Sequence, residues 1–73
     1  PLTYFYLARL SLNRGERYQE AVDLVKKGID LNPDKGELPL GYFLLADLYS
    51  RLGNASLSEE YAQKGRAAAD AAR

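Results

Sequence analysis

The chain has 73 residues, of which 47% are hydrophobic, and its ten basic residues balance ten acidic ones. This length allows one small domain, and the composition is typical of a folded protein and excludes a disordered one. With a formal net charge of zero, the chain has no net field to attract nucleic acid or anionic lipid. It contains no Cys, His, Met or Trp, so it has neither a disulfide framework nor a thiolate zinc site.

The first half of the chain predicts two helices. The apolar segment 2–14 is too long for a strand, and it is followed by Gly15, which readily adopts the left-handed conformation that ends helices. From Ala21 to Ile29 the apolar positions recur at i, i+3, i+4, i+7 and i+8, as in an amphipathic helix. The Asn-Pro-Asp sequence at 32–34 ends this second helix, because a residue before Pro is disfavoured in the helical region.

The second half repeats the first. Residues 1–15 recur 38 positions later as residues 39–53, with eight of the fifteen positions identical. Beyond them, Ser56 and Glu59 have the spacing of a capping box and predict a fourth helix with Ser56 as its N-cap. A repeat at this spacing is typical of stacked supersecondary units. We therefore expect four helices in two antiparallel pairs.

The two halves resemble a pair of tetratricopeptide repeats (TPRs). The family's pattern places a large aromatic residue, a Leu-Gly or Leu-Ala pair, a turn Gly, further small residues and a closing Pro at fixed positions. In the first repeat these positions are held by Tyr4, Leu7, Ala8, Ser11, Gly15, Ala21, Val25, Gly28 and Pro33. In the second they are held by Tyr42, Leu45, Ala46, Tyr49, Gly53, Ser58, Ala62 and Gly65. The chain departs from the family in its period of 38 residues instead of 34, in Ser11 instead of Tyr, and in lacking a Pro after the second repeat.

The resemblance implies an all-α fold in which two antiparallel helix pairs stack as a short right-handed superhelical solenoid. It covers residues 1–73 as a single TPR-like domain, with repeat one at about 1–34 and repeat two at about 39–70. A plain four-helix bundle is the alternative. The small residues at matching places, Gly28 and Gly65 among them, are expected where helix backbones approach closely, since Gly inside a helix otherwise costs ~1 kcal/mol.

The resemblance also implies that the first helix of each pair lines a concave groove for a partner. The residues carried over to this groove are Leu2, Phe5, Arg9, Leu12, Asn13, Leu40, Phe43, Asp47, Ser50 and Arg51. We expect Phe5 and Phe43 to form its apolar floor, with Arg9, Asp47 and Arg51 as polar contacts. The alternative is that both Phe side chains only pack in the interior and that Arg9 pairs with Asp47. A clamp for a C-terminal carboxylate is not expected, because Phe5 stands where the family's clamps place Lys.

The two ends of the chain are expected to differ. The first helix is apolar nearly all the way round, and only the second and third helices are available to cover it, which leaves Tyr6 and Leu10 facing solvent. Solenoids need about three repeats or capping elements for stability, so we expect an upstream repeat or a second copy at this edge. The fourth helix has the polar outer face of a C-terminal cap. A start at Pro1 without any Met suggests a piece of a longer protein.

The sequence does not predict a calcium site, a glycosylated loop, a nucleic-acid site or a catalytic site. Residues 30–36 superficially resemble a calcium loop, but Lys35 and Gly41 stand where an EF-hand has its Gly and its bidentate Glu. The glycosylation sequon at 54–56 is interpreted as a turn with an N-cap, and the tyrosines as core residues instead of stacking platforms for nucleic acid. With no His or Cys for nucleophile or base chemistry, we predict no catalytic residue, no metal and no cofactor.

The predicted function is a non-catalytic scaffold for protein–protein interaction, which presents its groove to a peptide or a partner protein. The alternatives are a docking or regulatory tail of a larger enzyme and a structural self-association unit. No nucleic-acid partner and no membrane insertion are expected, since charged residues interrupt every apolar run before the ~18 residues that a span needs. The absence of Cys and of a signal-peptide pattern in this segment favours a cytoplasmic location.

Overall fold

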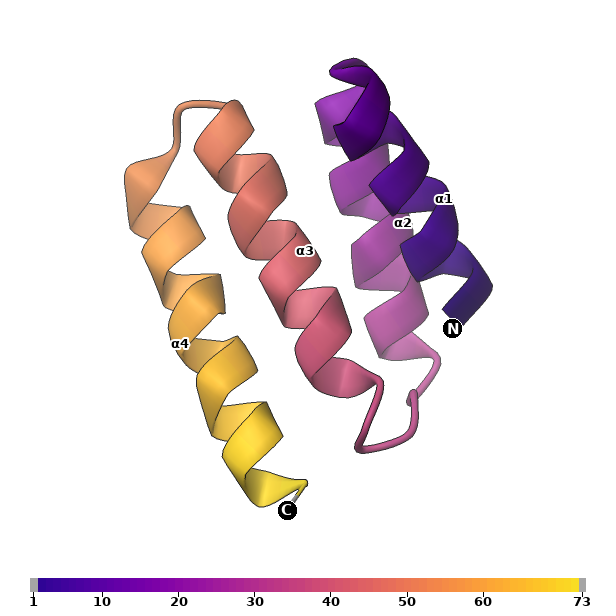
Figure 1. Cartoon of the computed structure of the whole chain (residues 1–73), viewed down its shortest axis with the longest axis vertical. Coiled ribbons are helices and arrows are strands. Elements are labelled where there is room, and N and C mark those ends of the chain that lie inside the picture. The colour runs from indigo at the N-terminus through magenta and orange to yellow at the C-terminus, as the bar shows by residue number, and fades with distance from the viewer. Residues whose placement is uncertain (1, 73) are drawn as a thin grey trace.

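The chain folds into four helices, and the all-helical class predicted from the sequence is confirmed. The computed structural model describes residues 2–72, and within that range it contains no strand. The helices are α1 (Leu2–Arg14), α2 (Tyr18–Asp30), α3 (Leu38–Arg51) and α4 (Ala55–Ala71). Figure 1 shows them as two antiparallel pairs, α1 with α2 and α3 with α4.

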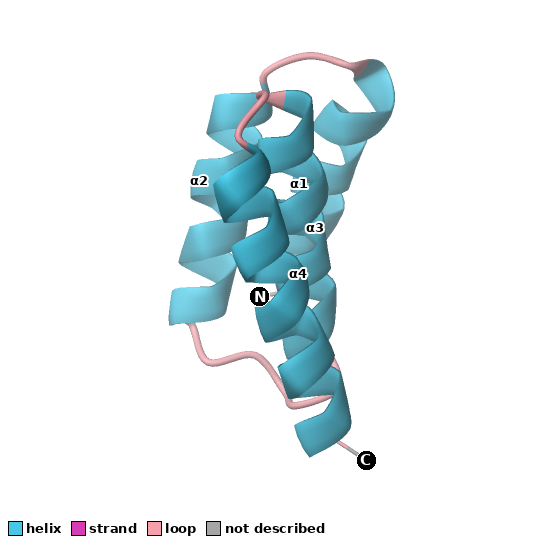
Figure 2. Ribbon diagram, turned by 90° about the vertical axis from the view of Figure 1, so that its left-hand side faces the viewer, coloured by secondary structure: helices cyan, strands magenta, loops and turns pink. Residues whose placement is uncertain are grey.

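The helices form an open arrangement with α3 in the middle. Contacts between backbones join α1 to α2, α2 to α3, α1 to α3 and α3 to α4, whereas α1 and α4 do not come together. Figure 2, which views the molecule from the side of α4, shows this helix in front of the other three. A closed four-helix bundle would bring the first and last helices into contact. As expected from the sequence, α1 is covered only by α2 and α3.

As predicted, the first helix of each pair is followed by one glycine in the left-handed conformation. Gly15 has a φ of +73° and Gly53 a φ of +80°, both in the left-handed region. The amide of Gly15 donates a hydrogen bond to the carbonyl oxygen of Ser11 at 3.0 Å, and that of Asn54 donates to Tyr49 at 2.9 Å. These bonds satisfy carbonyl groups that a helix end leaves without partners inside the helix.

The predicted cap of the fourth helix is wrong. The helix begins at Ala55, two residues after Gly53, and its N-cap is Asn54 instead of Ser56. The side-chain Oδ1 of Asn54 accepts a hydrogen bond from the amide of Leu57 at 3.1 Å. Asn caps helices as well as Ser does, so the earlier of the two candidates takes the position as soon as the chain leaves the left-handed turn.

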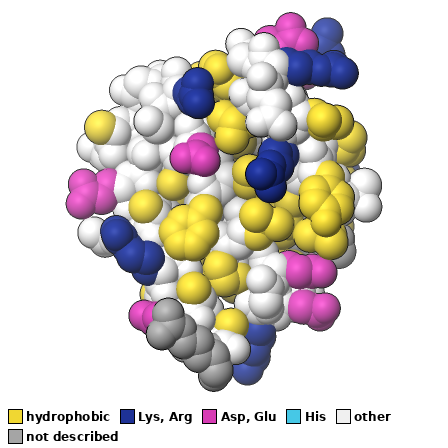
Figure 3. All heavy atoms as spheres, in the orientation of Figure 1, with side chains coloured by type: hydrophobic (Ala, Val, Ile, Leu, Met, Phe, Trp, Pro, Cys, Tyr) yellow, Lys and Arg dark blue, Asp and Glu magenta, His cyan; other side chains and the backbone are white. Residues whose placement is uncertain are grey.

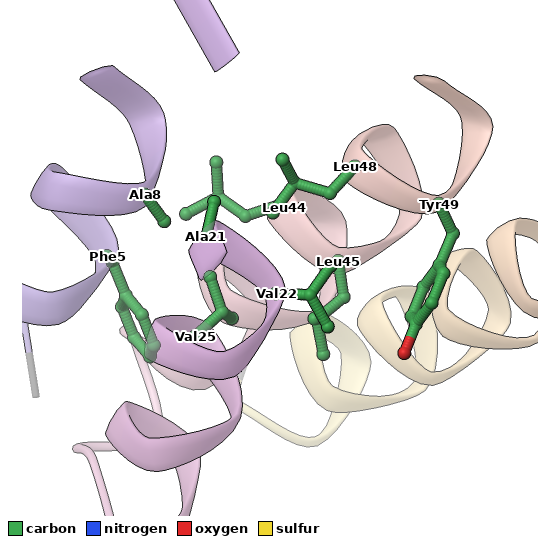
Figure 4. Packing of buried hydrophobic residues seen from close by; sticks show 9 residues of the cluster. All are labelled: Phe5, Ala8, Ala21, Val22, Val25, Leu44, Leu45, Leu48 and Tyr49. Atoms are coloured by element: carbon green, nitrogen blue, oxygen red, sulfur yellow. The ribbon is translucent and has the colours of Figure 1, made fainter. Parts of the chain in front are cut away.

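The hydrophobic core lies between α1, α2 and α3 (Figure 4). Its buried members are Phe5, Ala8, Ala21, Val22, Val25, Leu44, Leu45, Leu48 and Tyr49. Val22 does not belong to the apolar stripe predicted between Ala21 and Ile29, because that pattern assumes a helix with a single buried face. Because α2 packs against both α1 and α3, its buried face is wider, and Val22 is fully buried.

Helix α4 is attached to α3 by a hydrogen bond and by stacked aromatic rings. Ser58 Oγ donates to the carbonyl oxygen of Ala46 at 2.8 Å. The ring of Tyr61 stacks on those of Tyr42 and Tyr49, with centroids 6.2 Å and 5.6 Å away. Stacked pairs of this kind contribute about 0.5–1.5 kcal/mol beyond the area that they bury. The predicted interior position of the tyrosines is confirmed for Tyr49, which is buried, whereas Tyr42 is half-buried.

The close approach of α3 to the first helix pair depends on Gly41. A Cβ atom at this position would lie 2.8 Å from Phe5 Cζ, which is too short for a real contact, and 3.2 Å from Ile29 Cγ1, which is tighter than most contacts. The ring of Phe5 is completely buried and has no free space to move into. Glycine at this position therefore lets α3 lie directly over the Phe5 ring.

We expect Gly41→Ala to lower the free energy of unfolding by about 1 kcal/mol. Overpacking of a core costs about 1–3 kcal/mol, and the ~1 kcal/mol that Ala gains over Gly inside a helix offsets only part of this cost. Gly36→Ala is the control, because an added Cβ there has no atom within 4 Å. Urea unfolding of the two variants measures the difference, and equal midpoints would contradict the packing argument.

Candidate functional site

A hollow of about 340 Å³ lies between α1 and α3 and brings together residues from both predicted repeats. It is lined by Arg9, Leu12, Asn13, Leu40, Phe43, Leu44 and Asp47. All of these except Leu44 belong to the groove inferred from the sequence. We call this site the α1–α3 hollow.

Phe43 is the large apolar side chain of the α1–α3 hollow. One edge of its ring faces Gly65 of α4, where an added Cβ would lie 2.8 Å from Phe43 Cε1. Phe43 remains 39% exposed, although its ring packs against Gly65 of α4. Leu12 and Leu40 are half-buried beside the same hollow and pack against the core. Apolar side chains from both α1 and α3 therefore line the hollow beside its polar residues.

Two opposite charges lie among the residues that line the α1–α3 hollow. Arg9 comes from α1 and Asp47 from α3, and both side chains are exposed. They occupy equivalent places in the two repeats, 38 positions apart. No ion pair joins these two described residues, so the alternative in which Arg9 pairs with Asp47 is wrong. Both charges remain accessible to a partner.

Phe5 does not line the hollow, and its predicted place on an accessible groove floor is wrong. Its side chain has no exposed surface, because Gly41 of α3 and Ile29 of α2 close over the ring. The alternative of interior packing is therefore right for Phe5 and wrong for Phe43. The two residues hold equivalent positions in the repeat, but only Phe5 has a following helix pair to cover it.

Three further predicted groove residues lie away from the α1–α3 hollow. Leu2 is half-buried and lines a different hollow, formed by the start of α1 and the α2–α3 connection. Ser50 and Arg51 are exposed in the last turn of α3 and line none of the hollows described here. The inferred groove is therefore shorter than the resemblance implied.

The outward side of α1 carries exposed apolar residues, as predicted for Tyr6 and Leu10. Tyr6 is 57% exposed, Leu10 51% and Leu7 45%. We call these three residues the α1 edge. They line a second hollow of about 350 Å³ together with Thr3, Arg9 and Asn13. Figure 3 shows hydrophobic side chains gathered on the right-hand side of the molecule, over α1.

Leu7 was not predicted at this edge and was named only as holding a position of the TPR pattern. Its counterpart 38 positions later, Leu45, does lie in the interior. The signal that could have found Leu7 is the prediction that only the second and third helices cover the first. Leu45 is buried in α3, which follows α2, whereas no described helix precedes α1.

A third hollow, of about 350 Å³, lies between α2, α3 and α4. Its lysines contact tyrosine rings: Lys64 Nζ lies 5.0 Å from the centroid of Tyr61, and Lys26 Nζ lies 5.7 Å from that of Tyr49. A side-chain hydrogen bond with Tyr49 raises the pKa of Lys26 above its ordinary value. Cation–π contacts at exposed sites are worth about 0.5–1 kcal/mol each. The contact of Lys26 with Tyr49 joins α2 to α3, whereas Lys64 and Tyr61 both belong to α4. We assign both contacts a structural role.

Residues 2–72 also lack the features of a metal site and of a membrane span. Within them, no group of three or more His, Cys, Asp or Glu side chains is placed to hold a metal ion. None of the helices in this range has the length and apolar character needed to cross a membrane. Comparison of the chain with family models, with curated proteins and with solved structures finds no match.

We expect Gly65→Ala to displace the Phe43 ring while changing stability less than Gly41→Ala does. The added Cβ would lie 2.8–3.0 Å from three ring atoms of Phe43, but this ring is partly exposed and can turn toward the hollow. Replacing a mid-helix Gly by Ala also stabilises α4 by ~1 kcal/mol, which offsets part of the clash.

The measurement is the NMR chemical shifts of the Phe43 ring protons, together with urea unfolding of both variants. Gly36→Ala serves as the unperturbed reference, since its added Cβ meets nothing within 4 Å. Phe43 shifts that match those of the wild type would show that Gly65 does not position the ring.

Proposed function

We propose that this chain is a non-catalytic protein-interaction module that binds a peptide or a segment of a partner protein in the α1–α3 hollow. The observation that carries this proposal is Phe43, an aromatic residue that is partly exposed, lines the hollow and packs its ring against a glycine of α4. Aromatic residues of this kind, surrounded by polar residues, are typical anchors of protein interfaces.

The lining of the hollow indicates which peptide it fits. An apolar side chain of the peptide would pack against Phe43 and between Leu12 and Leu40. An acidic residue of the peptide would lie beside Arg9 and a basic residue beside Asp47, because opposite charges across an interface favour one orientation of the partner. The hollow therefore selects a short motif with one apolar anchor between opposite charges.

We also propose that the two helix pairs are TPR-like repeats stacked as a short solenoid. In support, Ala8 and Ala46 occupy matching places in α1 and α3, and both are buried. Gly65 is buried inside α4 and Gly28 in the last turn of α2, and glycine inside a helix costs ~1 kcal/mol unless it allows a close approach. The open order of helix contacts agrees with repeats that pack on their neighbours in sequence.

The exposure of Tyr6 and Leu10 favours a second candidate function, association through the α1 edge. Monomeric proteins seldom expose contiguous apolar patches of several large side chains unless a partner covers them. This candidate uses a different face of α1 and does not compete with the hollow for Phe43.

We expect Phe43→Ala to weaken the binding of a peptide that was selected on the wild-type chain by about tenfold or more. Tenfold corresponds to ~1.4 kcal/mol. Peptides are first selected on the wild-type chain from a displayed random library, and the affinity of the best one is then measured by fluorescence polarisation. Removal of the ring takes away the anchor contact without changing the buried core.

Leu52→Ala is the matched control for this experiment, because Leu52 is similarly exposed and lies outside the hollow. It should bind the selected peptide as the wild type does. Circular dichroism checks that Phe43→Ala remains helical. If Phe43→Ala binds every selected peptide as tightly as Leu52→Ala, the hollow is not the binding site and the proposal fails.

A further inference from the structure

We propose that the α1 edge is a docking surface for an amphipathic helix whose buried stripe resembles that of α2, supplied by a partner. The partner helix would carry small and β-branched residues on one face and acidic residues along the side that meets Arg9. This inference does not require the α1–α3 hollow to be a binding site.

The repeat shows that the α1 edge is equivalent to a surface that is covered elsewhere in this molecule. The two sets of residues, 38 positions apart, are Tyr6, Leu7 and Leu10 in α1 and Leu44, Leu45 and Leu48 in α3. Their exposed fractions are 57%, 45% and 51% for the first set and 6%, 0% and 0% for the second. Two of the three pairs are identical residues. Equivalent apolar surfaces thus occur on α1 and α3, but only the one on α3 is covered by other helices.

Helix α2 shows what kind of helix covers this surface. It packs against α3, and its residues Ala21, Val22 and Val25 are completely buried in one cluster with the three leucines of α3 (Figure 4). Small and β-branched side chains on this stripe allow the two helices to approach closely. Since the α1 edge repeats the α3 surface, a helix with the same stripe fits it.

The partner helix is expected to differ from α2 in its charges, because α1 and α3 carry different charges at equivalent positions. Arg9 lines the hollow at this edge, whereas the equivalent residue of α3 is Asp47. Helix α1 contains no acidic residue, and it carries a second positive charge at Arg14. A partner helix with an acidic residue beside Arg9 is therefore favoured over one with a basic residue there.

A second copy of this chain does not supply the required helix. The stripe of its own α2 is already buried, and α4 lacks such a stripe. Alignment of α4 with α2 places Glu59 where α2 has Val22, and Arg66 where α2 has Ile29, and both charged residues are exposed. Two α1 edges facing each other would bring two copies of Arg9 together without any acid on α1. A helix from a partner therefore fits this edge better than a second copy of the chain does.

The chain itself provides a probe for this surface. A synthetic peptide of residues 17–32, which contains α2, carries the one stripe that is known to fit the equivalent face of α3. Titrated into the full chain with labelled methyl groups, it is expected to shift the NMR signals of Leu7 and Leu10 in a saturable manner. A peptide with Val22→Glu and Val25→Glu is the control and should leave these signals unchanged.

Variants of the full chain complete the test. We expect Leu7→Glu with Leu10→Glu to weaken binding of the wild-type peptide by at least about tenfold, since a charge would enter an apolar contact. Leu31→Glu is matched in exposure, at 51%, but lies after α2 and should bind normally. Phe43→Ala should also bind this peptide normally, which separates this surface from the α1–α3 hollow.

Three results would overturn the inference. The first is equal binding of the wild-type and control peptides. The second is undiminished binding to the Leu7 and Leu10 variant, which would mean that the peptide exchanges with α2 in its own place. The third is a dimer in sedimentation experiments that dissociates in this variant, because that would make a second copy the occupant.

Discussion

The contact between Phe5 and Gly41 determines how closely the second helix pair packs on the first. Because residue 41 has no side chain, α3 begins directly over the Phe5 ring, which Ile29 of α2 also approaches. The first turn of α3 is thereby fixed against both α1 and α2. Further along the same two helices, Arg9 and Asp47 line a common hollow that this packing leaves open. The candidate site is thus a consequence of the close approach beneath it.

The repeat places chemically similar residues in different surroundings, and the neighbouring helices decide what each residue does. Phe5 is buried because α3 follows it, whereas Phe43 remains partly exposed because no helix pair follows α4 within the described residues. Leu45 is buried because α2 precedes it, whereas Leu7 is exposed. In stacked units each element contacts only its neighbours, so the unmatched faces lie at the ends of the stack. The α1 edge is a face of this kind, whereas the α1–α3 hollow lies between the two helix pairs.

The local features of the sequence predicted the helices well because they act over a few residues. Gly15 and Gly53 mark helix ends through their own backbone freedom, and the structure shows both in the left-handed region. Ser56 failed as a cap because Asn54, an equally good candidate, is reached first. The burial of Phe5 was not predictable in this way, since it depends on a glycine 36 residues away that no local pattern connects to it. The resemblance to TPRs correctly grouped most residues of the hollow, but it carried no information on which positions another helix covers.

Arg9 and Asn13 line both the α1–α3 hollow and the hollow at the α1 edge, so the two proposed surfaces are not independent. A partner helix that placed a carboxylate beside Arg9 at the edge would neutralise the positive charge that the hollow offers to a peptide. Asp47 would then be the dominant charge of the hollow, and a peptide with a basic residue would be favoured over one with an acidic residue. Since linkage is reciprocal, an acidic peptide in the hollow would weaken docking at the edge to the same degree. One arginine between two apolar surfaces is sufficient to couple them electrostatically without any movement of the helices.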